Sequence, residues 1–402
     1  MSNLIVGLDL GTTKVCACAG RKTKEREIEV VGVGIASCSG LHHGIVSNVN
    51  TTVSAIELAM SKVELVVGQS IKGVVVGMSG KSAKGVSSPG VVTISKGREI
   101  TRQDVNRVIE TAKAISLPGG TEILHTLPQG YKLDGQSGIE DPTGMCGIKL
   151  ECDVYIVTAS QTVIKNLIRC VEKSGFEPTG SPVLGLLAAS HSVLSLDEKN
   201  LGVVLIDIGG DTTDMGIFID GNLHYTFSLP VGGDHITTDI SVGLRTSFID
   251  AEKIKISAGC CLASLVEEGK EVDVASLGDG KLQSFPRYAI AGIIEERMEE
   301  IFLLLKEEMK GFKGLKTGVV LTGGGALLAG TVELGQQVFN MPTRIGKPMN
   351  LTGLSEAVDS PVYAVATGLL VYGIQNQARH IPANPFSKIR KGMKNFFSDL
   401  FE

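Results

Sequence analysis

Two short apolar segments of this sequence end in the same order of residues: an acid, then glycine, then threonine. Residues 4–10 contain the first and run into DLGTT at 9–13, and residues 201–207 contain the second and run into DIGGDTT at 207–213. A short, almost wholly apolar run is typical of a buried strand, and the glycines after it indicate a tight turn. Because the same strand and turn recur in both places, the sequence predicts a duplicated fold with two related halves.

The residues that follow the two strands suit the binding of phosphate groups. Glycine lets the backbone approach a ligand closely and point its N–H groups at phosphate oxygens, and threonine hydroxyls and a lysine add donors. A carboxylate at each strand end, Asp9 and Asp207, suits a Mg²⁺ ion held partly through water. The candidate phosphate-binding residues are Gly11, Thr12, Thr13 and Lys14 in the first loop, and Gly209, Gly210, Thr212 and Thr213 in the second.

A third glycine cluster, Gly323, Gly324 and Gly325, follows another apolar strand and would let a base and sugar lie against the backbone. Any one of these loops could be no more than a tight turn between packed elements. Three such loops, two of them with the same residue order, favour nucleotide binding. The sequence contains no GxxxxGK[ST] motif, so this is not a Walker A loop.

Length and composition narrow the class of protein. The chain has 402 residues, enough for two to three domains, with 43% hydrophobic and 20% charged residues, which excludes wholesale disorder. The net charge of -5 argues against a protein that coats nucleic acid. The longest uncharged apolar run, residues 361–374, is too short for a bilayer, and the first residues lack the pattern of a signal peptide.

The eight cysteines are predicted to be reduced, buried thiols, although Cys16 with Cys18, or Cys260 with Cys261, could bind a metal.

The last residues have the pattern of an amphipathic helix. Asn384 and Pro385 form a good helix start, and the apolar residues after them fall in an arc of about 140°. Basic residues lie on or toward the other face, and the long stem of Arg390 can carry its charge out of the apolar arc. This composition favours a helix lying in a membrane interface, although a helix docked on the protein itself or on a partner is the alternative. The membrane-binding candidates are Phe386, Ile389, Arg390, Met393, Phe396, Phe397, Leu400 and Phe401.

These motifs resemble those of the actin-like ATPase superfamily. DLGTT at 9–13 and DIGGDTTD at 207–214 resemble its two phosphate motifs, and LTGGGALLAG at 321–330 resembles its adenosine motif. The segment AEKIK at 251–255 resembles the helix that contacts adenosine, which implies that Glu252 and Lys255 lie near the ribose and base. A solvated helix face explains the same two residues equally well.

Within the superfamily, the chain resembles the FtsA family of bacterial division proteins over residues 3–402. The residues that carry this resemblance are 123–131, 134–145, 231–235 and 243–246. The resemblance implies an α/β, actin-like duplicated ATPase fold with an inserted α+β subdomain and a C-terminal amphipathic helix. It also implies binding of ATP with Mg²⁺, self-assembly into head-to-tail filaments, and tethering of FtsZ to the cytoplasmic side of the inner membrane at the division site. Its partners would be the FtsZ C-terminal tail, membrane lipid and later division proteins, with no nucleic acid.

Two other functions stay open at this stage: an FtsA-like pilus-assembly ATPase, and a sugar or acyl kinase of the same superfamily. The terminal helix argues against the first, since such a protein reaches the membrane through its partner.

The expected division of the chain is a core at 1–82, an inserted subdomain at 83–160, a return to the core at 161–200, a second core domain at 201–232 and 311–374, a smaller subdomain at 233–310, a linker at 375–384 and the membrane helix at 385–402.

Two positions depart from the family pattern. Asp211 stands where the second phosphate loop of the family has a third glycine, and a carboxylate beside a phosphate should weaken nucleotide binding unless it faces metal or solvent. Gly185 lies in the region where chaperone and kinase relatives place a catalytic acid. Without an acid there, no residue is clearly placed to orient the attacking water, so we expect at most weak ATPase activity and assign no catalytic residue.

Overall fold

The first half of the molecule is built on a mixed sheet. The computed structural model describes residues 4–95, 97–278 and 280–380. The sheet has the strand order β11-β6-β1-β2-β3-β20, and β12 also pairs with β6. Strands β1 to β3 form an antiparallel meander. The bounds are β1 Ile5–Leu10, β2 Lys14–Lys22, β3 Ile28–Ser37, β6 Gly73–Met78, β11 Glu177–Pro178, β12 Val183–Leu184 and β20 Leu351–Gly353. A small hairpin, β4 Leu41–His42 and β5 Ile45–Val46, follows β3.

The second half repeats this plan. Its sheet has the order β15-β14-β13-β18-β19, and β13 pairs antiparallel with β14 as β1 does with β2. The dipeptide Asp220-Gly221 is typical of a hairpin turn, and it forms one here, with positive φ of 49° and 80° between paired strands. The bounds are β13 Val203–Ile208, β14 Thr213–Ile219, β15 Asn222–Leu229, β18 Gly318–Thr322 and β19 Thr343–Ile345.

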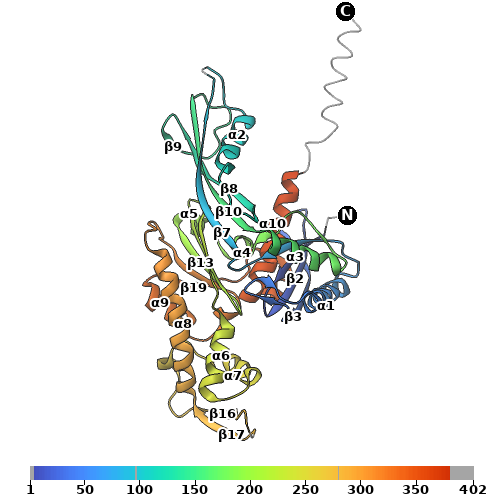
Figure 1. Cartoon of the computed structure of the whole chain (residues 1–402), viewed down its shortest axis with the longest axis vertical. Helices are drawn as coiled ribbons and strands as arrows, with labels where there is room; N and C mark the ends of the chain where they lie inside the picture. Colours follow the sequence, from blue (N-terminus) through green and yellow to red (C-terminus); the bar gives the residue numbers. More distant parts are fainter. Residues whose placement is uncertain (1–3, 96, 279, 381–402) are drawn as a thin grey trace, which may run out of the picture.

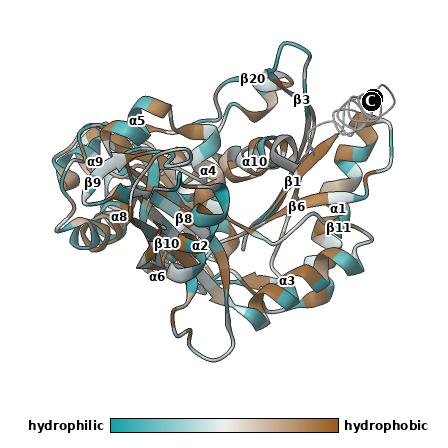
Figure 2. Ribbon diagram, turned by 90° about the horizontal axis from the view of Figure 1, so that it is seen from above, coloured by the Kyte–Doolittle hydropathy of each residue, from teal (hydrophilic) through white to brown (hydrophobic). Residues whose placement is uncertain are grey.

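Helices α4 and α10 pack between the two sheets (Figure 1). They approach so closely that a Cβ atom at Gly368 would lie 2.0 Å from the carbonyl oxygen of Ala188. The apolar strands β1 and β6 are coloured as hydrophobic in Figure 2, and they share one core with α1, α3, α4 and α10. The bounds are α1 Val49–Val67, α3 Gln161–Lys173, α4 Gly185–Val193, α5 Leu196–Leu201 and α10 Ala364–His380.

Helix α10 is longer than the sequence predicts. The nearly all-apolar residues 362–374 predict a buried helix, and residues 375–384 were expected to be a linker, but α10 continues to His380. Residues 375–380 are polar and contain neither glycine nor proline, so nothing in them ends a helix. A linker over 375–380 is therefore wrong.

A smaller group of elements extends from the second sheet, at the bottom of Figure 1. Helix α8 joins this group to the sheet, because Ile294 and Phe302 belong to the same core as Val204 and Leu321. Residues 104–115 and 289–309 have the apolar spacing of helices, and the structure has a helix at each place that starts two residues earlier. The bounds are α6 Gly233–Leu244, α7 Phe248–Ala258, β16 Glu271–Ala275, β17 Leu282–Pro286, α8 Arg287–Met309 and α9 Thr331–Phe339.

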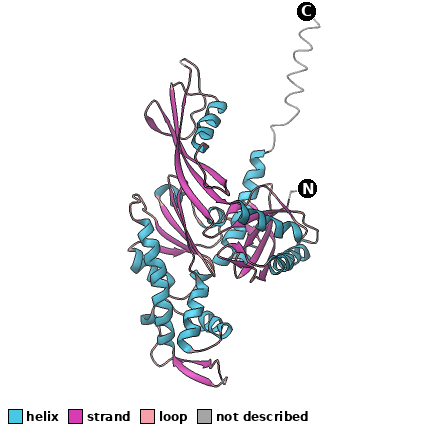
Figure 3. Ribbon diagram, viewed as in Figure 1, coloured by secondary structure: helices cyan, strands magenta, loops and turns pink. Residues whose placement is uncertain are grey.

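A separate four-stranded sheet with the order β7-β10-β8-β9 lies at the other end of the molecule (Figure 3). Helix α2 covers it over a small core of its own that includes Val108 and Leu150. The bounds are β7 Ala83–Thr93, α2 Arg102–Lys113, β8 Thr121–Leu133, β9 Gln136–Ile139 and β10 Lys149–Ser160.

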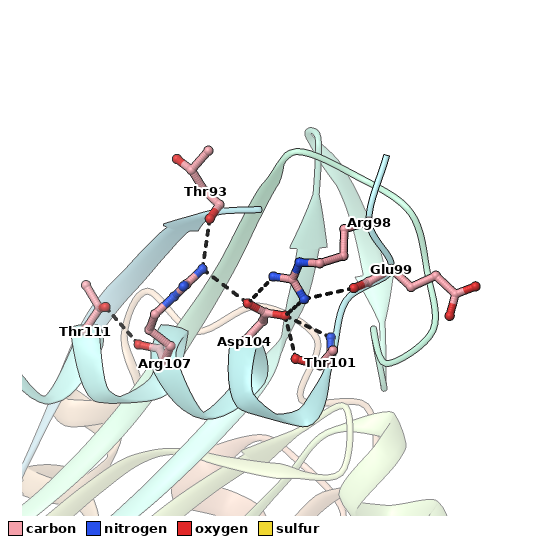
Figure 4. A network of polar contacts seen from close by, with 7 residues as sticks. All are labelled: Thr93, Arg98, Glu99, Thr101, Asp104, Arg107 and Thr111. Carbon is pink, nitrogen blue, oxygen red and sulfur yellow. Dashed lines mark hydrogen bonds and ion pairs between the residues drawn. The ribbon is translucent and has the colours of Figure 1, made fainter. Parts of the chain in front are cut away.

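The start of α2 is fixed by a polar network around Asp104 (Figure 4). The pattern Thr101-x-x-Asp104 resembles a capping box, and the box is present. Oδ2 of Asp104 accepts from the backbone N–H of Thr101 at 3.0 Å and also from its hydroxyl at 2.7 Å. Arg98 donates to both carboxylate oxygens, at 2.8 and 2.9 Å. Hydrogen bonds from Arg98 and then Thr101 hold the pKa of Asp104 well below its usual range.

Candidate functional site

A cavity of about 640 Å³ lies where the loops after β1, β13 and β18 meet. Both predicted acids and all three predicted glycine loops line it. The lining residues that the sequence predicts are Asp9, Gly11, Thr12, Thr13, Lys14, Asp207, Gly209, Gly210, Thr212, Glu252, Lys255, Gly323, Gly324 and Gly325. Thr213 is the exception: it is buried in β14 and its hydroxyl donates to the carbonyl oxygen of Val231 at 2.8 Å.

The loops of the two halves approach each other too closely for side chains larger than glycine. A Cβ atom at Gly210 would lie 2.3 Å from Cγ2 of Thr13, across the boundary between the halves. A Cβ atom at Gly232 would lie 2.7 Å from the carbonyl oxygens of Gly209 and Gly210. Glycine at these positions therefore leaves backbone groups exposed to the cavity, as phosphate binding requires.

Three carboxylates gather at the floor of the cavity. Asp207 pairs in register with Asp214 on the neighbouring strand, and Asp9 lies at the end of β1. Burial, with the nearby charges of Asp214 and Asp9, raises the pKa of Asp207 to about 7. Burial also raises the pKa of Asp214 to about 6, and that of Asp9. The ammonium of Lys14, 3.5 Å from Oδ2 of Asp9, offsets part of this negative charge.

The other side of the cavity contains two charged residues of α7, Glu252 and Lys255. Lys255 is buried, and its Nζ donates to the carbonyl oxygen of Gly233 at 2.9 Å and to Oγ1 of Thr237 at 2.8 Å. The same nitrogen lies 2.7 Å from Oε2 of Glu252. This network fixes α7 against the start of α6 and leaves both side chains at the cavity wall.

Several lining residues were missed by the sequence analysis, among them Ser79, Asp214, Asp234 and Arg287. Asp214 had a signal, because a strand pairing antiparallel with β13 brings the acid of the TTD motif opposite Asp207. Ser79 and Arg287 come from chain segments with no local motif, so only the folded arrangement identifies them.

The structure explains the two departures from the family pattern, Asp211 and Gly185. The carboxylate of Asp211 turns to the β4–β5 hairpin, where it contacts His42 and His43. Gly185 begins α4, and a Cβ atom there would lie 2.3 Å from Oγ of Ser79, which lines the cavity. Any side chain at position 185 would thus have to displace a hydroxyl of the cavity wall.

The predicted amphipathic helix at 385–402, with all of its membrane-binding candidates, lies outside the described residues. Within the described part of the chain, no helix combines the length and apolar character needed to cross a bilayer. All eight cysteines are free and seven are buried, with Cys146 exposed.

Comparison with known proteins gives consistent matches. The family model for "Cell division protein FtsA" matches residues 204–368, and that for the "SHS2 domain inserted in FTSA" matches residues 80–158. The cell division protein FtsA of Pseudomonas aeruginosa is 40% identical over 378 residues, covering 93% of this chain and 90% of the relative. That of Borreliella burgdorferi is 40% identical over 397 residues, covering 98% and 96%.

Solved structures share the fold at low identity. A chain of the PilM–PilN type IV pilus biogenesis complex matches with a TM-score of 0.66 and 15% identity, covering 92% of this chain and 98% of its own. MreB5 of Spiroplasma citri bound to ADP matches with a TM-score of 0.55 and 16% identity, covering 94% and 99%. The predicted actin-like ATPase fold with an inserted α+β subdomain is confirmed.

Proposed function

The chain belongs to the FtsA family of cell division proteins, and we propose from this that it binds ATP with Mg²⁺, assembles into filaments and tethers FtsZ to the membrane. Its role in cell division follows from the family. The observation that best supports the nucleotide part is the convergence of three glycine loops, from two facing sheets, on one cavity with acids at its floor.

In the proposed complex, the loops after β1 and β13 hold the phosphates from both sides. The backbone N–H of Gly210, with the hydroxyls of Thr12 and Thr13, would donate to phosphate oxygens. The N–H of Gly11 instead shapes the loop, because it donates to the carbonyl oxygen of Lys14 at 3.0 Å. The adenosine would lie between α7 and the loop containing Gly324. The related MreB5 structure is described as bound to ADP, which supports this assignment.

The carboxylates fit a Mg²⁺ ion. Asp9, Asp207 and Asp214 are buried together, burial raises the pKa of each, and Lys14 supplies only part of a compensating positive charge. A divalent cation would supply that charge and neutralise the phosphates, and these oxygen ligands are those that Mg²⁺ prefers. Asp9 and Asp207 would hold it, directly or through water, with Asp214 beside them.

We propose that hydrolysis is slow. Gly185 has no side chain, and the neighbouring hydroxyl of Ser79 is not a strong base. The nucleotide would then act mainly by stabilising one arrangement of the two halves and so the filament. Single-turnover hydrolysis of ATP at a rate typical of metabolic kinases would overturn this part.

The membrane anchor would be the amphipathic segment at 385–402, at the end of a chain that otherwise carries net negative charge. The FtsZ tail would dock on the smaller subdomain at 233–310, and later division proteins would join the assembled complex. Because many weak tethers act on one polymer, their combined attachment is far stronger than any one of them. The protein would thus act on the cytoplasmic side of the inner membrane, at the division site.

Calorimetric titration of Mg-ATP into the full chain tests the nucleotide part. We expect one site per chain that is lost in Asp207→Asn and weakened in Gly210→Ala. Unchanged affinity in both variants would place the nucleotide elsewhere and contradict the proposal.

A further inference from the structure

Two consecutive histidines of the first half meet an aspartate of the second half beside the nucleotide cavity. His42 ends β4, and His43 and Gly44 form the turn to β5 with positive φ of 47° and 75°. This turn places the two imidazole rings with their centroids 4.1 Å apart. Asp211 comes from the second phosphate loop, between Gly210 and Thr212, both of which line the cavity.

The three side chains converge through their polar atoms. Nδ1 of His42 lies 2.6 Å from Oδ2 of Asp211, and Nδ1 of His43 lies 3.3 Å from Oδ1. One nitrogen or oxygen from each residue can be chosen so that all three atoms lie within 4.8 Å of one another. The Asp211 side chain is 7% exposed, whereas that of His42 is 69% exposed, so the group is fixed on one side and open to solvent on the other.

We propose that His42, His43 and Asp211 form a binding site for a divalent transition metal, best matched by Zn²⁺, that joins the two halves beside the cavity. Two imidazole nitrogens and one carboxylate oxygen form a ligand set of open zinc sites, in which water takes the fourth position. Imidazole selects zinc and its neighbours over Mg²⁺, which prefers oxygen ligands alone, so this site is distinct in kind from the acids of the cavity.

The distance between His43 and Asp211 already suits such a site. Zinc bonds of about 2.0–2.1 Å separate two tetrahedral ligands by about 3.3 Å, which is the spacing between Nδ1 of His43 and Oδ1 of Asp211. His42 is closer to the carboxylate, and its exposed ring is free to turn. Backbone support is also present, because the N–H of His43 donates to Oδ2 of Asp211 at 2.7 Å and keeps the carboxylate oriented.

A metal bound at this site would link the two halves of the molecule. Its two histidine ligands belong to the hairpin whose residue Leu41 is buried in the core of the first half, and its carboxylate ligand belongs to the loop that follows β13. A ligand that binds only when both parts are in place stabilises that arrangement by mass action. The metal would therefore hold the hairpin and the second phosphate loop together.

Zinc titration of the full chain tests the site, after removal of metals by chelation and without nucleotide. Excess Mg²⁺ is kept present to occupy the acids of the cavity, and Co²⁺ in place of Zn²⁺ gives a visible absorption band for ligand geometry. We expect one saturable site. His42→Gln and Asp211→Asn should each weaken it by more than the roughly tenfold that loss of a supporting group costs.

The matched control is Cys146→Ser, because this exposed thiol is the obvious competing zinc ligand. It should leave both the affinity and the stoichiometry unchanged. Hydrogen exchange gives an independent readout: Zn²⁺ should slow exchange of the His43 amide in the unaltered protein and not in His42→Gln. Since His42 is exposed, this variant decides the question even if Asp211→Asn folds poorly.

Three results would overturn the proposal. These are the lack of any saturable zinc uptake, equal affinity in the unaltered protein and His42→Gln, and uptake that disappears in Cys146→Ser. In each case the three residues would be only a hydrogen-bonded contact between the halves.

Discussion

A Cβ atom at Gly323 would lie 2.2 Å from Oδ1 of Asp207. The third glycine loop is therefore in direct contact with the acid that ends β13, and the φ of 83° at Gly323 is in the region that favours glycine. The loop proposed to contact adenosine and the acid proposed to hold Mg²⁺ thus approach each other at a residue without a side chain.

Replacing Gly323 by alanine should destabilise the nucleotide-free protein by about 2 kcal/mol or more, because it adds both a clash and backbone strain. Gly324→Ala is the matched control, since a Cβ atom there meets no atom within 4 Å and its φ is not positive. Urea unfolding of both variants checks this. Equal midpoints for the two would contradict the described contact.

The buried acids at the floor of the cavity predict an unusual pH dependence of the free energy of unfolding. Asp207 and Asp214, with pKa values raised to about 7 and about 6, bind protons more tightly in the folded than in the unfolded state. Between roughly pH 4 and 7 the folded state therefore holds more protons, and the free energy of unfolding falls as pH rises. Without nucleotide or divalent metal, Asp207→Asn should be more stable than the unaltered protein at pH 8, by about 1 kcal/mol or more.

Near pH 5 the advantage of Asp207→Asn should disappear, because both acids are then largely protonated in the folded protein. Thermal unfolding across this pH range, with chelator present, measures the difference. Parallel pH profiles for the two proteins would show that Asp207 does not carry the unfavourable charge.

Asp104, in the inserted subdomain, should make the opposite contribution to the pH dependence of the free energy of unfolding. Its pKa is held low by Arg98, so its contribution to stability is complete above about pH 4 and is lost only as the pH falls further. Asp104→Asn should destabilise the start of α2 by about 1–3 kcal/mol at neutral pH, since hydrogen bonds to a charged group are lost. Hydrogen exchange of the α2 amides measures this locally.

Glu110→Gln is the control for Asp104 on the same helix. Its partner Lys113 lies 2.8 Å away, but the Glu110 side chain is 66% exposed, and pairs of this kind contribute little. Faster exchange in Glu110→Gln equal to that in Asp104→Asn would show that the network in Figure 4 does not hold the helix start.

How much of the structure can be predicted from the sequence depends on whether the interactions are local or join residues far apart in the chain. The glycine loops were predictable because phosphate binding needs a short, local pattern of small residues and donors after a strand. The contact of Asp211 with His43 was not, since the two residues are 168 positions apart and come from different halves. The helix continues into the expected linker because that linker was placed on the polar residues from 375 together with Pro382, and polar residues without glycine or proline do not end a helix.

The terminal segment allows a matched test of membrane attachment. Phe396→Asp should weaken vesicle binding by about 10- to 100-fold, because burial of one aromatic side chain contributes about 1.5–3 kcal/mol. Asn395→Asp introduces the same charge one position away, on the polar face of the expected helix, and should have little effect. Vesicle co-sedimentation compares the two, and equal losses would indicate a general charge effect instead of a buried apolar face.

Tethering of FtsZ is the central claim, and vesicle flotation with fluorescent FtsZ and ATP tests it most directly. The full chain is compared with a chain truncated after Ile381. We expect the full chain to carry FtsZ to the vesicles and the truncated chain to carry none. If the full chain floats and leaves FtsZ behind, or if neither chain floats, the tethering account is contradicted.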